Sequence, residues 1–163
     1  MVGREEIAEG VTFAGWVPHG QLQDRLIESD VFAFPSIREF GGAVALEAMA
    51  VGVVPIVFDY GGPGELVTEK TGYLIPMGPR AQIIGRYRQL LTELAQHPEQ
   101  IDARSPHAIR RAHEQFTWDA KARQVLEVYR WACDPSLPKP HFGMPLPDLN
   151  GETSSANSTA VTK

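Results

Sequence analysis

Short apolar runs rich in β-branched and aromatic residues recur along the first half of the chain. They lie at Val11–Gly15, Val31–Pro35, Pro55–Asp59 and Gly72–Pro76. None of them alternates strictly between apolar and polar positions, which is typical of strands that are buried on both faces of a sheet. Helical spacing separates them, in Leu22, Leu26 and Ile27 and again in Val44, Leu46, Ala48 and Met49. Strand and helix in alternation predict an α/β fold with a parallel sheet.

The second half of the chain has mainly helical periodicity. One apolar stripe repeats at intervals of three and four through Ile83, Ile84, Tyr87, Leu90, Leu91 and Leu94. A second helix is predicted over Ser105–Gln115, and the basic cluster of Arg104, Arg110 and Arg111 is expected to be a solvated face. The segment therefore predicts helices that cover the sheet.

A third C-terminal helix is predicted to begin after Thr117, a suitable N-cap, with Asp119 in its first turn. Its apolar face holds Trp118, Ala122, Val125, Tyr129 and Ala132. This apolar stripe needs a surface on which to pack.

Composition narrows the class of partner and the compartment. The 163 residues carry 15 basic and 20 acidic side chains, a formal charge of −5, which disfavours nucleic acid and anionic membranes as partners. The single cysteine, Cys133, excludes an internal disulfide and a thiolate zinc site, as expected of a cytoplasmic protein. The charged first ten residues predict no signal peptide, and no apolar stretch is long enough for a transmembrane segment.

The character of the chain changes near residue 134. Five prolines fall between residues 135 and 147 and are followed by a polar run rich in Ser and Thr. We therefore predict one domain over residues 1–133 and a disordered tail over residues 134–163.

The most informative stretch runs from the strand at Val31–Pro35 through a loop and a glycine pair into a helix that begins near Ala43. The backbone N–H groups of Gly41, Gly42 and Ala43 are expected to be free and to point toward the mouth of the sheet. This arrangement favours an anionic ligand.

Two carboxylates bracket this turn. Glu39 lies in the loop and Glu47 lies inside the helix, among apolar neighbours that predict burial. A buried carboxylate needs a hydrogen-bonding partner, and ribose hydroxyls are suitable. The spacing alone is weakly specific, and an exposed loop carboxylate and a solvated helix carboxylate are the alternatives. A second glycine-rich loop, Gly61–Glu65, also follows a strand. Its glycines are explained either by ligand binding or by the backbone conformation of an ordinary turn.

In combination these residues resemble the C-terminal, donor-binding domain of retaining glycosyltransferases of family 4, which have the GT-B fold. The resemblance covers residues 11–132 and is most specific in the E-x7-E motif, from Glu39-Phe40-Gly41-Gly42 to Glu47-Ala48-Met49-Ala50. Supporting segments, in the order of the family, are Phe13–Val17, Ser29–Phe32, Gly61–Glu65, Thr71–Leu74 and Phe116–Trp118. The fold class implied is a partial Rossmann-like, doubly wound parallel sheet.

The resemblance implies a role for each matched residue. Glu39 is implied to be the catalytic residue that contacts hydroxyls of the donor sugar, and the backbone of Gly41, Gly42 and Ala43 is implied to lie beside the sugar and phosphates. Glu47 is implied to bind the ribose. Val17 and His19 are implied to belong to a wall around the nucleobase. The donor is expected to be a UDP- or GDP-hexose, with no metal and no further cofactor.

Several parts of the family pattern have no counterpart in this sequence. The basic residues that bind phosphate, the first two strands and the acceptor domain are absent, so we expect a chain that is inactive alone. The resemblance also implies that the helix from Trp118 runs back toward the acceptor domain, and without that domain we expect an exposed apolar patch. The strand predicted at Val11–Gly15 is expected either to move in beside Val31–Pro35 or to leave an open sheet edge. Alternatives are a subunit that pairs with a separate acceptor-binding chain through the face Trp118–Ala132, a nucleotide-sugar-binding module, and a non-functional fragment.

Overall fold

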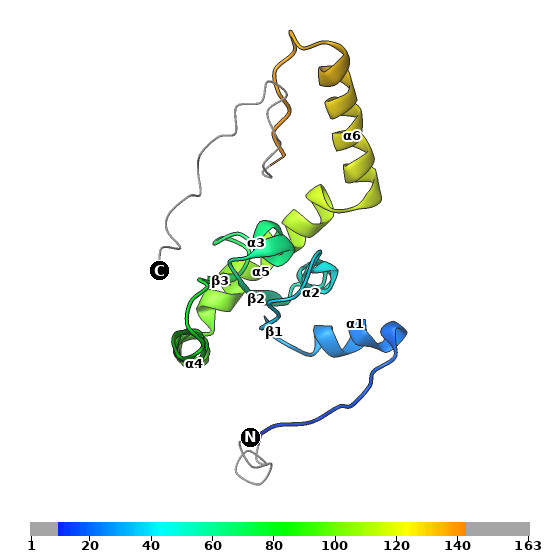
Figure 1. The fold of residues 1–163 in the computed structure, drawn as a ribbon. Helices are drawn as coiled ribbons and strands as arrows, with labels where there is room; N and C mark the ends of the chain where they lie inside the picture. Colours follow the sequence, from blue (N-terminus) through cyan, green and yellow to red (C-terminus); the bar gives the residue numbers. More distant parts are fainter. Residues whose placement is uncertain (1–9, 143–163) are drawn as a thin grey trace. The chain divides into compact units, whose positions relative to one another are not determined.

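The computed structural model describes residues 10–142, which divide between two compact units, with the boundary between His113 and Glu114. Figure 1 labels the elements. In chain order they are α1 (His19–Ile27), β1 (Val31–Phe34), α2 (Ala43–Ala50), β2 (Val54–Phe58), α3 (Gly61–Leu66), β3 (Tyr73–Ile75), α4 (Arg80–Gln96), α5 (Glu99–Gln115) and α6 (Trp118–Cys133). The predicted α/β class is confirmed.

The three strands form a parallel sheet in the order β1-β2-β3, with Ala33 opposite Ile56 and Ile56 opposite Tyr73. The central strand β2 is buried along its whole length. On one face, Val57 packs with Ala45 and Met49 of α2 and with α5. The other face is covered by α4 and includes Ile56, Phe58 and Ile75. The core therefore lies on both sides of β2, as the uninterrupted apolar run predicted.

Polar side chains of α5 bind backbone carbonyl groups elsewhere in the first unit. Ser105 Oγ donates to the carbonyl of Gly52 at 2.7 Å, and Arg111 Nε donates to that of Leu66 at 2.8 Å. Arg104 stacks on the ring of Tyr73 at 4.2 Å. The prediction of a solvated arginine face is therefore wrong for Arg104 and Arg111, because both residues are half-buried. Their guanidinium groups donate hydrogen bonds to backbone carbonyl groups that have no partner within a helix or strand.

Two expected boundaries differ in the structure. The Gly61–Glu65 loop is instead part of the short helix α3. The helix predicted from Ser105 begins at Glu99 and continues through Pro106. Packing of Ala108 and Ala112 in the core offsets the hydrogen bond that the proline removes and the clash of its ring with the preceding turn. The residue preceding a helical proline is not a reliable boundary when the helix packs on a core.

The strand predicted at Val11–Gly15 is wrong. These residues are exposed and belong to no helix or strand, with Phe13 at 74% exposure. Their composition suits a strand, but an isolated strand is unstable without a neighbour to pair with. Within the described residues, β1 is accordingly an edge of the sheet that pairs only with β2. The alternative of an open edge is the one that the structure has.

The second unit contains α6, and its predicted start is confirmed. Thr117 is the N-cap, and its side-chain oxygen accepts a hydrogen bond from the backbone N–H of Ala120 at 3.2 Å. The predicted exposed patch is also present, because Trp118 is 91% exposed and Tyr129 is 63% exposed.

The residues that follow α6 are described only as far as Phe142, and residues 134–142 contain no helix or strand. Most of the predicted disordered tail lies outside the described residues, and the domain boundary at residue 133 stays a prediction. No helix among residues 10–142 is long and apolar enough to cross a membrane.

The half-buried phenol of Tyr87 makes the free energy of unfolding depend on pH in the alkaline range. Its hydroxyl donates to the carbonyl of Ile56 at 2.8 Å, and burial raises the pKa of Tyr87 to about 12. Because the folded chain holds this proton more tightly than the unfolded chain, the stabilisation is complete below pH 10 and is lost as the pH rises from 10 toward 12. Tyr87→Phe should remove this decline and cost about 1 kcal/mol at neutral pH. Urea unfolding between pH 8 and 11.5 tests this, with Tyr60→Phe, an exposed tyrosine, as the control.

The open edge of β1 should favour association between chains. The backbone N–H of Val54 donates to the carbonyl of Asp30 at 3.1 Å, so by alternation Phe32 also faces β2, and Val31 and Ala33 present their backbone groups to the open edge. Ala33→Pro should therefore block the edge without removing a ladder bond. We expect less light scattering on incubation at 37 °C and a free energy of unfolding within about 1 kcal/mol of wild type. Phe32→Pro, which removes a ladder bond, should destabilise the chain strongly. Equal scattering by wild type and Ala33→Pro would show that the edge is not adhesive.

Candidate functional site

Both glycine-rich segments follow strands that are neighbours in the sheet. Residues 35–42 connect β1 to α2, and α3 begins three residues after the end of β2. Because β1 and β2 are parallel, both segments lie at the carboxyl edge of the sheet, where open α/β sheets bind ligands. The topology thus brings the two predicted loops together.

Glu39 closes the first loop on itself. Its Oε1 accepts hydrogen bonds from the backbone N–H groups of Gly41 at 3.3 Å and Gly42 at 3.2 Å. Gly42 is the N-cap of α2 and has a left-handed backbone, with φ +64°. The expectation of free N–H groups is therefore wrong for Gly41 and Gly42, because the nearest carboxylate of the chain satisfies them. Ala43, the first residue of α2, is exposed.

The two segments are packed backbone against backbone. A Cβ atom on Gly42 would lie 2.8 Å from Cγ of Pro63, and a Cβ atom on Gly62 would overlap the carbonyl oxygen of Phe40. Glycine is therefore required at both positions by close approach, and at Gly42 also by its φ. Close packing, which the sequence alone could not reveal, accounts for these two glycines without a ligand.

Glu47 is exposed, so the prediction of a buried carboxylate is wrong. α2 buries the side that carries Ala45, Ala48 and Met49, and Glu47 lies on the opposite side of the helix. The apolar neighbours suggested burial because the small alanines made both sides of this helix look apolar. The side chain of Glu47 makes no hydrogen bond or ion pair with another of the described residues, which leaves its oxygens available to a ligand.

A cavity of about 330 Å³ brings Glu47 together with His19. Its lining comes from α1 and α2 and consists of His19, Gly20, Leu22, Gln23, Leu26, Glu47 and Ala50. Val17, half-buried before α1, does not line this cavity, and neither does Glu39. Gln23 was not predicted as a site residue, although it lies one helical turn after His19, and that spacing was a usable signal.

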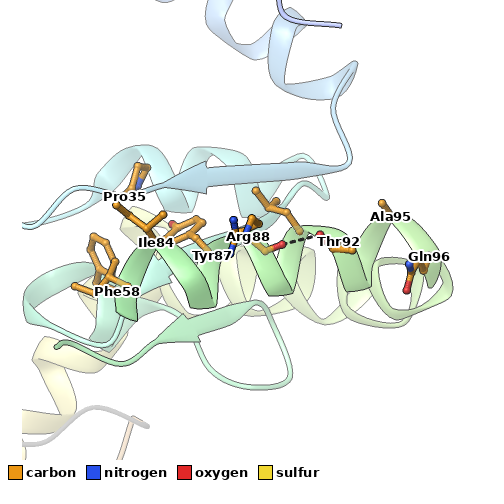
Figure 2. A pocket seen from close by; sticks show the side chains of 10 residues that line it. Pro35, Phe58, Ile84, Tyr87, Arg88, Thr92, Ala95 and Gln96 are labelled. Atoms are coloured by element: carbon orange, nitrogen blue, oxygen red, sulfur yellow. Dashed lines mark hydrogen bonds between the residues drawn. The ribbon is translucent and has the colours of Figure 1, made fainter. Parts of the chain in front are cut away.

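A larger cavity of about 730 Å³ lies elsewhere and holds none of the predicted site residues. Figure 2 shows that Ile84 and Tyr87 of α4 are on the side of the helix that faces Pro35 and Phe58. Its surface is mainly apolar, and its polar side chains all belong to α4, so they do not converge from several elements as in a specific binding site. We interpret it as apolar surface of α4 beside the open edge of β1.

Comparison with known protein families assigns the chain to a family. Residues 1–107 match the family described as "Glycosyl transferases group 1". The chain belongs to this family. The sequence-based recognition of a glycosyltransferase is thereby confirmed.

Named relatives of this group 1 glycosyltransferase have two activities in their names. The chain is 36% identical over 127 residues to a D-inositol 3-phosphate glycosyltransferase of Rhodococcus opacus, a match that covers 77% of this chain and 27% of the relative. It is 29% identical over 133 residues to an alpha-maltose-1-phosphate synthase of Mycolicibacterium smegmatis, covering 77% of this chain and 34% of the relative. The chain thus spans about a quarter to a third of the length of these relatives.

The described part of this glycosyltransferase holds no cluster of three or more His, Cys, Asp or Glu side chains that could bind a metal ion. The polar groups that the fold does place at the carboxyl edge include backbone N–H groups, single carboxylates and the exposed guanidinium of Arg38. Such groups bind hydroxyl groups and anions by hydrogen bonds.

The close contact between the two glycine-rich segments predicts that a side chain at Gly62 destabilises the fold. Gly62→Ala should force the α3 turn away from Phe40 and lower the free energy of unfolding by about 1–3 kcal/mol. Gly41→Ala is the matched control, because a Cβ atom there meets no other atom within 4 Å. Urea unfolding measures both variants. Equal stability of the two variants would contradict the packed arrangement.

Proposed function

We propose that the chain is the donor-binding portion of a retaining hexosyltransferase of glycosyltransferase family 4, and that it holds a UDP- or GDP-hexose. The observation that carries the proposal is the cavity between α1 and α2 in which His19 and Glu47, residues distant in sequence, lie together. Glu47 belongs to the helix that directly follows the first glycine-rich loop. Membership of the group 1 glycosyltransferases supports a sugar-nucleotide ligand.

The size and chemistry of the cavity suit the nucleoside part of the donor. A volume of about 330 Å³ is at the lower end for small-molecule sites, so the cavity encloses part of a nucleotide sugar rather than all of it. The carboxylate of Glu47 accepts hydrogen bonds from the two ribose hydroxyls and replaces those that they lose with water. His19 and Gln23 contribute an imidazole and an amide to the base.

The loop at the carboxyl edge takes the diphosphate and the sugar. In this proposal the donor displaces Glu39 from the N–H groups of Gly41 and Gly42, and these groups together with Ala43 at the start of α2 face the anion. The released carboxylate of Glu39 then accepts hydrogen bonds from sugar hydroxyls. Arg38, exposed beside Glu39, supplies positive charge to the leaving diphosphate, a role for which the sequence analysis named no residue.

Transfer itself requires an acceptor site, which we place outside this chain. The chain spans about a third or less of its named relatives, and the proposal is that a separate domain or polypeptide supplies the acceptor site. The chain alone is then inactive in transfer and acts in the reducing cytoplasm. A non-catalytic subunit of a split transferase and a nucleotide-sugar-binding module are the alternative forms of this function, and both retain the donor site.

Calorimetric titration of the purified chain tests the donor site. UDP, GDP, UDP-glucose and GDP-mannose are the probes, and one pair should bind saturably. Glu47→Ala should weaken that binding at least about tenfold, because a hydrogen bond to a charged group is lost. Asp24→Asn is the matched control: this carboxylate is on α1, next to Gln23, but does not line the cavity, and its loss should leave affinity unchanged.

Two results decide against the proposal. A folded chain that binds none of the four probes lacks a working donor site. Equal weakening by Glu47→Ala and Asp24→Asn means that overall charge, rather than the cavity, controls binding. Sugar transfer by the chain alone, at ordinary enzyme rates, contradicts the separate acceptor site but not donor binding.

A further inference from the structure

One helix, α5, holds the far ends of both helices that begin at the glycine-rich edge of the sheet (Figure 1). At the end of α3, Arg111 Nε donates to the carbonyl of Leu66 at 2.8 Å, and its Nη2 donates to that of Glu65 at 3.4 Å. At the end of α2, Nε2 of His113 donates to the carbonyl of Ala50 at 3.3 Å. α5 is therefore a common support for α2 and α3.

Arg111 supplies what the end of α3 lacks. The last carbonyl groups of a helix have no N–H partner within the helix, and the helix dipole favours a cation beside them. A guanidinium presents several N–H groups in one plane, so it reaches two such carbonyls at once. Because Arg111 is half-buried and lies 45 positions after Leu66, its hydrogen bond fixes the end of α3 to a distant part of the chain.

A displacement at the end of α3 is transmitted to its beginning. α3 has six residues, a length of about 9 Å, and connects the contact with Arg111 to the second glycine-rich segment. Gly62 packs against the carbonyl of Phe40, too closely for a Cβ atom at that glycine. Pro63 packs in the same way against Gly42. A shift of α3 therefore moves the loop that carries the backbone N–H groups of the first glycine pair.

We propose that Arg111 is a positioning residue for the diphosphate part of the donor. It sets the place of α3, and α3 in turn holds the N–H groups of Gly41 and Gly42 where they face the anion. Its guanidinium lies at the opposite end of α3 from the glycine-rich edge, so it acts through the helix and not on the ligand. The ligand in this inference rests on the proposed function, whereas the coupling between Arg111 and the glycine loop does not.

The amide resonances of the glycine loop test the coupling in the full chain without any ligand. Arg111→Met removes the hydrogen bonds to α3 but keeps a long side chain, and it should shift the N–H resonances of Gly41 and Gly42 in a nitrogen–proton correlation spectrum. Arg110→Met is the matched control, because it makes the same change of charge at an exposed guanidinium that binds His107 on α5 itself. It should leave both resonances at their wild-type positions. Shifts that are equal in the two variants, or absent in both, overturn the proposal.

Calorimetric titration measures the consequence for the donor, with the nucleotide sugar that binds wild type as the probe. Arg111→Met should raise its dissociation constant at least about tenfold, because the displaced N–H groups no longer meet the anion. Arg110→Met should leave the constant within about twofold of wild type. Arg111→Gln places an amide nitrogen as many bonds from the backbone as Nε, so it keeps a donor for the carbonyl of Leu66 without the charge. It should restore the constant to within about threefold of wild type.

Folding controls separate a positioning role from a loss of stability. Urea unfolding and circular dichroism measure the folded fraction of each variant. A loss of stability alone lowers the number of binding sites, but it leaves the dissociation constant and the resonances of the folded chain unchanged. If Arg111→Met does not fold, Arg111→Gln still decides, because it should keep both the resonances and the affinity of wild type.

Three outcomes separate this inference from the proposed function. An affinity for the nucleotide sugar that Arg111→Met leaves unchanged overturns the positioning role. An Arg111→Gln variant that binds at least about tenfold more weakly than wild type also overturns it, because the hydrogen bond to Leu66 is then not what matters. A wild-type chain that binds no nucleotide sugar contradicts the proposed function instead, and the amide resonances still decide whether Arg111 positions the glycine loop.

Discussion

The central strand β2 is the constraint on which the first unit depends. All five of its residues are buried, so both of its faces must be covered and both of its edges must be paired. β1 and β3 supply the edges, α2 and α5 cover one face, and α4 covers the other. Burial of this strand also aligns the ends of β1 and β2. The position of the candidate site is thus a consequence of how the apolar strand is covered.

Polar groups in this unit divide into two kinds with different surroundings. Those that hold the fold are bound to backbone carbonyl groups, as Ser105 is to Gly52 and Tyr87 is to Ile56. Those assigned to the donor are exposed or bound only to their own loop, as Glu47 and Glu39 are. A side chain that makes no hydrogen bond to the rest of the fold can bind a ligand without a loss of folding stability. Glu47 differs in this respect from Arg111, which is half-buried and donates a hydrogen bond to the carbonyl of Leu66.

The sequence predicted the elements whose signal is local. Three of the four expected strands, the start of α2 and the Thr117 cap follow from residue type and spacing, and they are confirmed. It could not predict what depends on neighbours in space. Val11–Gly15 has the composition of a strand but no strand to pair with, and Glu47 is exposed although its neighbours in sequence are apolar. The pairing of His19 with Glu47 was implied only by family resemblance, and the self-closure of Glu39 was not predicted.

The backbone contact at Gly42 and Gly62 has a consequence for how this edge of the sheet can change. Each glycine is fixed by an atom of the other segment, Pro63 in one case and Phe40 in the other. A substitution in one segment therefore requires a compensating change in the other, although the two glycines lie twenty positions apart along the chain. A library that varies one segment alone will return mostly misfolded chains. New shapes at this edge become accessible only when residues 40–42 and 61–63 are randomised together.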